Sequence, residues 1–412
     1  METSKQKHLS ATRLFSLRGC GLIDNMTIET IPEAQDLEKD KLIDPRAYEV
    51  ADCGNYAEIV NTLTKENLLN EEIERVQDCY KTTLEHAVWM TEKDWEMLTV
   101  MDCYDNRTAH HCVETLRIAE DRIERFKAGG KKFSELIKDE EVPLDEFFRA
   151  CLFHDIGKCL IPRAILNNSF FDEDFDTQLC NDIFRGGKKE FLAAIEKTTG
   201  HIFEGEGNDM DLREYLRTNH VHTMRYVPAI EMLSEEDINV ARERFPSLNF
   251  SKATLADILE FHEENSENIL LAQGFDMAAN IAGKHHNYRK LEMRFPVSTD
   301  ILGVTIALEE LLTLSDMKQA LSAKRSYKNS LNSPLILHNL IFEAERHEIS
   351  PVITSLWVEQ ELALISSEER RGHDEQTIFA IHECEEFIKK HQSLVEDFVN
   401  AIQNKTVETS TY

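Results

Sequence analysis

Apolar residues recur along most of this 412-residue chain at the three- and four-residue spacing that is typical of one face of an α-helix. The clearest examples are Val113, Leu116, Ala119, Ile123 and Phe126, and further on Leu255, Ile258 and Leu259, which share their predicted face with His262. The alternation of apolar and polar residues that indicates β-strands is scarce, and only 9 prolines and 15 glycines interrupt the chain. We therefore expect an almost wholly helical, all-α fold.

The same pattern divides the chain into three predicted parts. Residues 1–100 are expected to form an N-terminal accessory segment, residues 101–358 the main domain, and residues 359–412 a C-terminal helical extension. Within the main domain, residues from about 167 to 251 separate the parts that carry candidate chemistry, and we interpret them as an insertion. The extension is an acidic amphipathic helix, which could cap the core or join two copies in a homodimer.

Charge narrows the choice of partners. The chain has 46 Lys and Arg residues against 76 Asp and Glu residues, which gives a formal net charge of −30. Such a balance repels nucleic-acid backbones and anionic membrane surfaces, so polymeric DNA or RNA and membranes are not expected as partners. A small anionic substrate remains compatible with this charge, because metal ions and one or two local cations can dominate a pocket.

The cysteines and the length of the apolar runs indicate in which cellular compartment the protein is expected. The 9 cysteines are scattered and include no Cys-x-x-Cys pair, which argues against a structural zinc site and favours free thiols in an intracellular enzyme. No apolar run resembles a signal peptide, and none approaches the roughly 18 residues of a membrane span. The expectation is a cytoplasmic protein.

Seven histidine and aspartate residues stand where helical patterns can present them to one shared pocket. They are His111, His154, Asp155, His262, His285, His286 and Asp316. Imidazole and carboxylate groups suit first-row divalent metals, and neutral histidines with a bridging aspartate commonly hold two of them. The set predicts a two-metal phosphohydrolase, although each residue alone could be a satisfied polar group of the core.

The pair His154-Asp155 ends an apolar run that must be buried. A charged aspartate at that position is costly unless it is paired or bound to a metal. A structural network of His154, Asp155 and Lys158 is the alternative explanation. The chain holds a second such pair, His373-Asp374, but that pair lies in a polar stretch and is predicted to have no chemical role.

Two pairs of adjacent histidines are interpreted differently. Neighbouring helical positions lie roughly 100° apart, so His285 and His286 can reach two metals or two sides of one site. In the pair His110-His111, we expect one ligand, His111, and one bystander. The bland alternative for both pairs is surface polarity.

Several runs around these residues resemble the motifs of one enzyme family. They are Thr108 to His111, Leu152 to Lys158, His262 to Leu270, Lys284 to Asn287, Leu314 to Leu321 and Arg325 to Lys328. Together they resemble the HD-GYP branch of the HD-domain metal-dependent phosphohydrolases, over roughly residues 104–167 and 254–358.

The resemblance implies an HD-domain helical bundle with two adjacent divalent metals, commonly iron or manganese. All seven histidines and aspartates would be ligands, with Asp155 bridging the metals and an activated hydroxide attacking phosphorus. Asp155 and Lys158 would be the catalytic residues, while Lys158 and Arg325 would bind the substrate phosphate. The usual family substrate is a cyclic dinucleotide, typically cyclic di-GMP.

Besides the insertion from about residue 167 to 251, which replaces a short connection in the family, the chain departs from the family pattern at three places. Asn287 follows the double histidine where the family has Glu, and Arg294-Phe295-Pro296 stands near the missing Gly-Tyr-Pro signature. Arg107 occupies a position where some members carry a ligand of a third metal, so we expect two metals. Two alternatives therefore stay open: an HD-type phosphohydrolase of another nucleotide, and a catalytically silent signalling or scaffold module.

Overall fold

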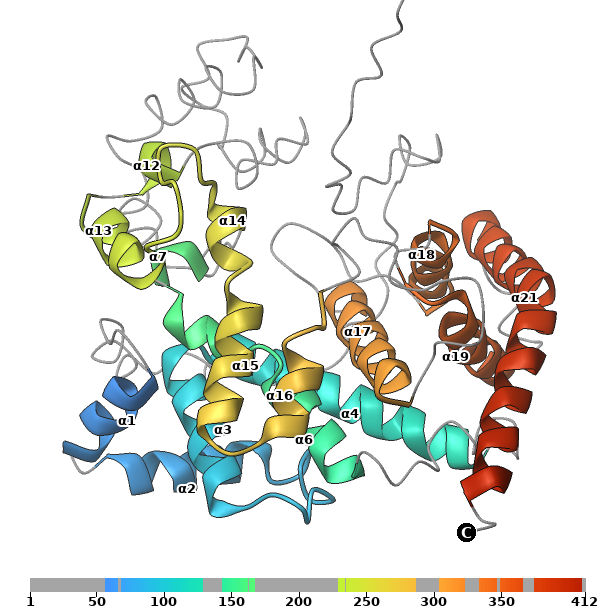
Figure 1. The fold of residues 1–412 in the computed structure, drawn as a ribbon, viewed down its shortest axis with the longest axis horizontal. Coiled ribbons are helices and arrows are strands. Elements are labelled where there is room, and N and C mark those ends of the chain that lie inside the picture. Colours follow the sequence, from blue (N-terminus) through green and yellow to red (C-terminus); the bar gives the residue numbers. More distant parts are fainter. Residues whose placement is uncertain are drawn as a thin grey trace, which may run out of the picture.

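Every regular element that the structure describes is helical, which confirms the all-α prediction (Figure 1). The structure is a computed structural model, and it describes residues 56–65, 68–128, 143–161, 163–166, 229–233, 235–286, 304–322, 333–346, 349–365 and 374–409.

The helices follow the chain in this order. The first group is α1 (Tyr56–Lys65), α2 (Leu69–Tyr80), α3 (Glu92–Tyr104), α4 (Asn106–Ala128), α6 (Leu144–Phe153), the 3₁₀-helix η5 (Ile156–Leu160) and α7 (Arg163–Leu166). The second group is α12 (Ala229–Met232), α13 (Glu235–Arg244), α14 (Leu255–Leu259), α15 (His262–Ala272), α16 (Asp276–Ala282) and α17 (Val304–Ser322). The last group is α18 (Ser333–Glu345), α19 (Pro351–Leu364) and α21 (Glu375–Thr409).

Local sequence signals explain where several of these helices begin. A capping box of Thr91 and Asp94 starts α3, and Thr254 and Asp257 start α14 in the same way. Ser350 caps α19, whose first residue is proline, as is common at that position. These caps satisfy backbone N–H groups that a helix start would otherwise leave without partners.

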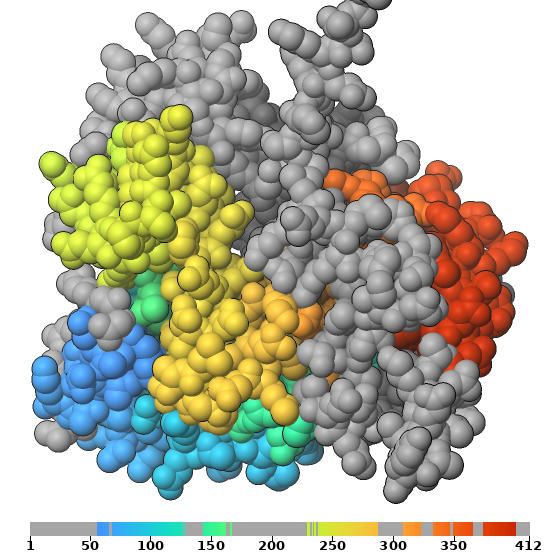
Figure 2. All heavy atoms as spheres, in the orientation of Figure 1, coloured from blue at the N-terminus to red at the C-terminus, as the bar shows by residue number. Residues whose placement is uncertain are grey.

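Two hydrophobic clusters form the interior. The larger one extends from residues of α1 and α2 to residues of α21, and the apolar stripe predicted on α4 lies fully within it. The smaller cluster consists of residues from α7, α12, α13 and α14 and from the segments beside them. Figure 2 shows the side chains of α12 to α14 gathered in a lobe of their own. Helices α1 to α3 therefore share the main core, while the three-part division of the chain stays a prediction.

The helices that carry the candidate residues pack closely on one another. Helix α15 contacts η5 and α16, α16 contacts α6 and α17, and α17 contacts α4. Figure 1 shows α15, α16 and α17 side by side, with α18, α19 and α21 forming the far end of the molecule. The result is a bundle in which residues distant in the sequence meet between α4, α6, α15, α16 and α17.

Other expectations concern the rest of the chain. Most of the predicted insertion lies outside the described residues; α12 and α13 belong to its described part. The described cysteines Cys79, Cys103, Cys112, Cys151, Cys159 and Cys384 are free thiols. Across the described helices, none has the length and apolar character needed to cross a membrane.

Candidate metal centre

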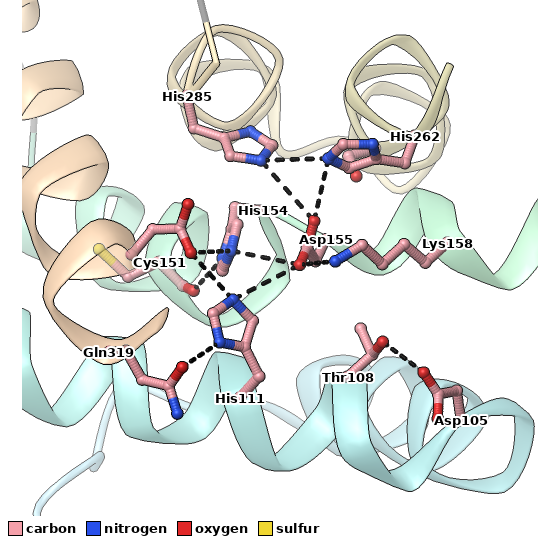
Figure 3. A network of polar contacts seen from close by, with 12 residues as sticks. Asp105, Thr108, His111, Cys151, His154, Asp155, Lys158, His262, His285 and Gln319 are labelled. Atoms are coloured by element: carbon pink, nitrogen blue, oxygen red, sulfur yellow. Dashed lines mark hydrogen bonds and ion pairs between the residues drawn. The ribbon is translucent and has the colours of Figure 1, made fainter. Parts of the chain in front are cut away.

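The His154-Asp155 pair stands at the junction of two helices. Helix α6 ends at Phe153, and its apolar face is buried in the main core. His154 is the C-cap of α6 and Asp155 the N-cap of η5. Both side chains point toward the other histidines of the site (Figure 3). Both residues are buried, as the sequence predicted.

Gly157 allows the next turn to lie directly against α15. A Cβ atom at this position would come within 2.1 Å of the His262 carbonyl oxygen and 2.5 Å of the Ser266 backbone nitrogen. Both neighbours are backbone atoms and cannot move aside. In addition, the Gly157 N–H donates to the buried Ser266 Oγ over 2.8 Å. This close approach brings His262, the first residue of α15, to within 3.1 Å of Asp155 Oδ1.

The double histidine lies just beyond the end of α16. His285 is buried, its Nε2 is 3.7 Å from Asp155 Oδ1 and 3.3 Å from His262 Nε2, and its carbonyl accepts a hydrogen bond from Thr313 of α17 over 3.0 Å. The ring of His286 lies beside it at a tilt of 42°, with 4.0 Å between the ring centroids. Helices α16 and α17 together therefore hold this pair over the carboxylate.

The opposite side of the site comes from α4 and α17. His111 Nε2 lies 3.0 Å from Asp316 Oδ1 and 3.5 Å from Asp155 Oδ2. His154 Nε2 lies 3.5 Å from the same Asp155 oxygen and 3.9 Å from Asp316 Oδ1. Asp155 is thus flanked by histidines on both of its oxygens.

These residues form two groups that could each hold a metal ion. The first consists of Asp155, His262, His285 and His286, and the second of His111, His154 and Asp155. Asp316 adjoins the second group through its contact with His111. All seven predicted ligands therefore lie together, and Asp155 is common to both groups, as a bridging carboxylate would be.

Hydrogen bonds at Nδ1 set the direction of the imidazoles. In His154, His262 and His285, Nδ1 donates to the backbone carbonyl three residues earlier, over 2.9, 2.5 and 2.7 Å. A carbonyl only accepts, so Nδ1 carries the hydrogen, and in a neutral ring Nε2 presents a lone pair. Each of these Nε2 atoms faces the carboxylates. Such an outer hydrogen bond is the usual device that orients a metal-binding histidine.

The imidazole nitrogens and carboxylate oxygens of the site are therefore arranged as they would be around a bound cation. The facing Nε2 atoms of His262 and His285 would oppose two lone pairs at 3.3 Å if both rings were neutral. Among the described residues, the buried atoms His154 Nε2 and Asp155 Oδ1 make no hydrogen bond. Donors about 2.1 Å from a metal lie about 3 Å from their neighbours in an octahedron, close to the shorter spacings seen at this site.

Protonation states agree with metal binding. Burial lowers the pKa of His154 to about 3 and also lowers the pKa of His262. Burial acts in the same direction on His285, but the nearby Asp155 carboxylate outweighs it and raises the pKa of His285. A proton on His285 is the simplest way to separate the two facing rings when no metal is bound. Metal binding would displace that proton.

The carboxylates at the site stay ionised. Burial alone would raise the pKa of Asp155, but the charge of Lys158 and the surrounding imidazoles of His154, His262 and His285 hold it well below its usual range. Asp316 is likewise held below its usual range, because contact with His111 outweighs the effect of burial on its pKa. The site thus offers two anions to a cation.

Lys158 closes one side of the site. Its Nζ donates to Asp155 Oδ2 over 2.5 Å, and 26% of its side chain is exposed. Burial lowers the pKa of Lys158, but Asp155 more than offsets this, so the net pKa is raised and the ammonium remains charged. This contact is also the one expected of a structural His–Asp–Lys network.

Not every expected residue can be located. Arg325, Asn287 and the Arg294-Phe295-Pro296 run lie outside the described residues. His110 is exposed, away from the cluster that His111 joins. Asp374 caps the start of α21 by accepting hydrogen bonds from the backbone and side chain of Thr377.

Three supporting residues were not singled out from the sequence: Ser266, Thr313 and Gln319. Gln319 Oε1 lies 2.6 Å from His111 Nδ1, and Gln319 follows Asp316 by three positions on one helix. The spacing Asp-x-x-Gln on a helical face was a signal that could have found it. Nothing local marks Ser266 or Thr313.

Comparison with known families gives one match. Residues 108–241 match the family model of the HD domain. The matched segment includes His111, His154 and Asp155 and ends before His262, so this part of the chain is similar to HD domains. A search of curated proteins and a search of solved structures return no match.

Proposed function

We propose that this chain is a metal-dependent phosphodiesterase of the HD-GYP type that hydrolyses a cyclic dinucleotide, with cyclic di-GMP as the first choice. One observation carries the proposal: four imidazole Nε2 atoms converge on the two oxygens of one buried aspartate. The aspartate belongs to a segment that matches the HD domain, and HD domains are generally metal-dependent hydrolases.

Two divalent ions, iron or manganese, would share Asp155. The ligand groups are His262, His285 and His286 on its Oδ1 side, and His111, His154 and Asp316 on its Oδ2 side. When bound, such ions polarise phosphoryl oxygens and activate water for attack on phosphorus. The protein's own part is to hold these side chains in neutral imidazole and anionic carboxylate form, which the burial and hydrogen bonds of the site support.

Lys158 would contact the substrate phosphate. Its ammonium group is charged, partly exposed and held at the carboxylate edge by Asp155. An anionic phosphate oxygen near that edge would gain a charge-assisted hydrogen bond without moving the backbone. Arg325 would be a second phosphate-binding cation, in a part of the chain outside the described residues.

The remaining features of the proposal follow from charge and composition. A net charge of −30 disfavours nucleic-acid polymers and anionic membranes, so the partner would be a small phosphate ester. We also propose a cytoplasmic location. Helix α21 presents Ile378 and Phe379 as exposed apolar residues, which is compatible with a homodimer.

The test combines metal content with turnover. Purified protein is reconstituted with Fe²⁺ or Mn²⁺, its metal is measured by elemental analysis, and cyclic di-GMP hydrolysis is followed by chromatography. We expect two ions per chain and a linear dinucleotide product. The double variant His154→Ala/Asp155→Ala should lose both ions, because Asp155 is common to both groups.

A matched control is available on the surface. Glu85 and His86 are also an adjacent acid–histidine pair, 3.3 Å apart, but His86 is 82% exposed. The Glu85→Ala/His86→Ala variant should keep metal and turnover. Two ions without hydrolysis of cyclic di-GMP would replace the substrate by another phosphate ester; no bound metal after reconstitution would favour the scaffold alternative. Full turnover in the His154/Asp155 variant would disprove the site.

A further inference from the structure

One face of helix α17 carries a stripe of buried polar residues. Glu309, Thr313, Asp316 and Gln319 follow one another at spacings of four, three and three residues and so lie on one face. The N-terminal half of the stripe faces the double histidine, where Glu309 pairs with Lys284 and Thr313 with the His285 carbonyl. The C-terminal half faces His111 instead.

His111 differs from the other histidines of the site in its position on a helix. His154, His262 and His285 lie at helix ends, where the carbonyl three residues earlier is available to their Nδ1 atoms. His111 lies inside α4, and its Nδ1 hydrogen-bonds to a residue of another helix instead of to a carbonyl of its own chain segment. Its orientation therefore depends on that other helix.

Gln319 supplies that acceptor. Its Oε1 lies 2.6 Å from His111 Nδ1, and the residue as a whole is 8% exposed (Figure 3). Asp316, one turn earlier on α17, lies 3.0 Å from the other ring nitrogen. The two residues hold both ends of one imidazole, so the ring cannot turn without breaking one of these contacts.

We propose that Gln319 is a positioning residue that directs the Nε2 lone pair of His111 toward the metal position formed with His154, Asp155 and Asp316. It accepts the Nδ1 hydrogen and thereby sets the tautomer that the three helix-end histidines obtain from their own backbone. This inference rests on the proposed two-metal function. It concerns one of the two ions only, because His111 belongs to one of the two groups.

Three variants test the assignment. Gln319→Met keeps the length and helix propensity of the side chain but removes the acceptor, whereas Gln319→Glu keeps an acceptor oxygen. Gln360→Met is the matched control, since Gln360 Oε1 also accepts from a buried side chain, Arg122, over 2.9 Å, but at a distance from the site. Each protein is titrated with Mn²⁺, and bound ions are followed by calorimetry and by electron paramagnetic resonance.

The expected result is a selective loss of one ion. Gln319→Met should bind one Mn²⁺ as the wild type does and the second about 10- to 100-fold more weakly, with the spectrum of an isolated ion replacing that of a coupled pair. Gln319→Glu should bind the second ion at least as tightly as the wild type, because a carboxylate makes the imidazole more basic. Gln360→Met should bind both ions normally.

The outcomes separate this inference from the proposed function. A wild type that binds fewer than two Mn²⁺ ions overturns the two-metal function, and the inference with it. A wild type that binds two, together with a Gln319→Met variant that also binds two at unchanged affinity, overturns the inference alone. If Gln319→Met does not fold, Gln319→Glu still decides, because weaker binding of the second ion by that variant contradicts the proposed role.

Discussion

Two clusters of buried charge lie against α4 and α17, and they are completed in different ways. In the first, Glu361 accepts hydrogen bonds from Arg122 and from Lys318, the latter over 2.6 Å, and Arg122 stacks on Trp357 with 4.2 Å to the ring centroid. In the second, Asp155 faces four imidazoles whose Nε2 atoms point at its oxygens.

The difference teaches how to tell a structural cluster from a binding site. Glu361 is neutralised by cations of the chain itself, so that cluster needs nothing from outside. Asp155 has Lys158, but the imidazoles around it present lone pairs toward carboxylates and toward each other. Such an arrangement is unfavourable until a proton or a metal ion enters. The incomplete cluster is therefore the one with a ligand to bind.

The largest effect should come from breaking the complete cluster. Arg122→Met removes a buried cation and leaves Glu361 with less compensation, which should cost about 3–5 kcal/mol of unfolding free energy. Urea denaturation of wild type and variant measures the loss. Mn²⁺ stoichiometry of the folded variant should stay at the wild-type value; a loss of metal at unchanged stability would show that the two clusters are not independent.

Completing the incomplete cluster should stabilise the fold. A ligand that binds the native state at about 100 times its Kd adds about 2.7 kcal/mol per site, so Mn²⁺ should raise the melting temperature of the wild type. Calorimetry with and without metal measures this shift, and a chelator should reverse it. The His154→Ala/Asp155→Ala variant should show no shift, and an equal shift in that variant would locate the metal elsewhere.

Gly157 links stability to the site. Gly157→Ala places a Cβ against two backbone atoms of α15, which should cost about 1–3 kcal/mol and move His262 away from Asp155. Chemical denaturation and Mn²⁺ titration check both effects. Gly274→Ala is the control: Gly274 has a φ of 84° and open space around it, so alanine should cost about 1–2 kcal/mol and leave metal affinity unchanged.

Acid should weaken the complete cluster gradually. Burial would raise the pKa of Glu361, but Arg122 and Lys318 outweigh it and lower the pKa below the usual value. A lowered pKa in the folded state contributes stability above the unfolded pKa, and that contribution is lost as the pH falls through the folded pKa. The stability difference between wild type and Glu361→Gln should therefore shrink below about pH 4.5. A constant difference in urea denaturation at each pH would contradict this assignment.

The helical fold could be predicted because the spacing of apolar residues within a short stretch of sequence already indicates a helix. The stripe from Val113 to Phe126 has the period of one helical face, and that face is buried. The gathering of the seven histidines and aspartates also followed from their place beside apolar runs. Their role as metal ligands stays a proposal.

What sequence reasoning could not supply depends on contacts between distant helices. The hydrogen bond between Gln319 and His111 spans 208 positions, and the one between Gly157 and Ser266 spans 109. No local pattern encodes the approach of η5 to α15, because it depends on how the helices pack. Helices α1 to α3 share one core with the later helices. The sequence did not predict this, because an apolar helix face does not indicate which other helix it packs against.

The placement of histidines at helix ends has a consequence for how such a site can arise or be built. A histidine at the end of a helix is oriented by its own chain, so a single substitution can supply a ligand that already points in a defined direction. His111, which lies within a helix, depends instead on a second residue on another helix, Gln319. For an engineer grafting an imidazole centre into a helical scaffold, helix ends are therefore suitable first positions.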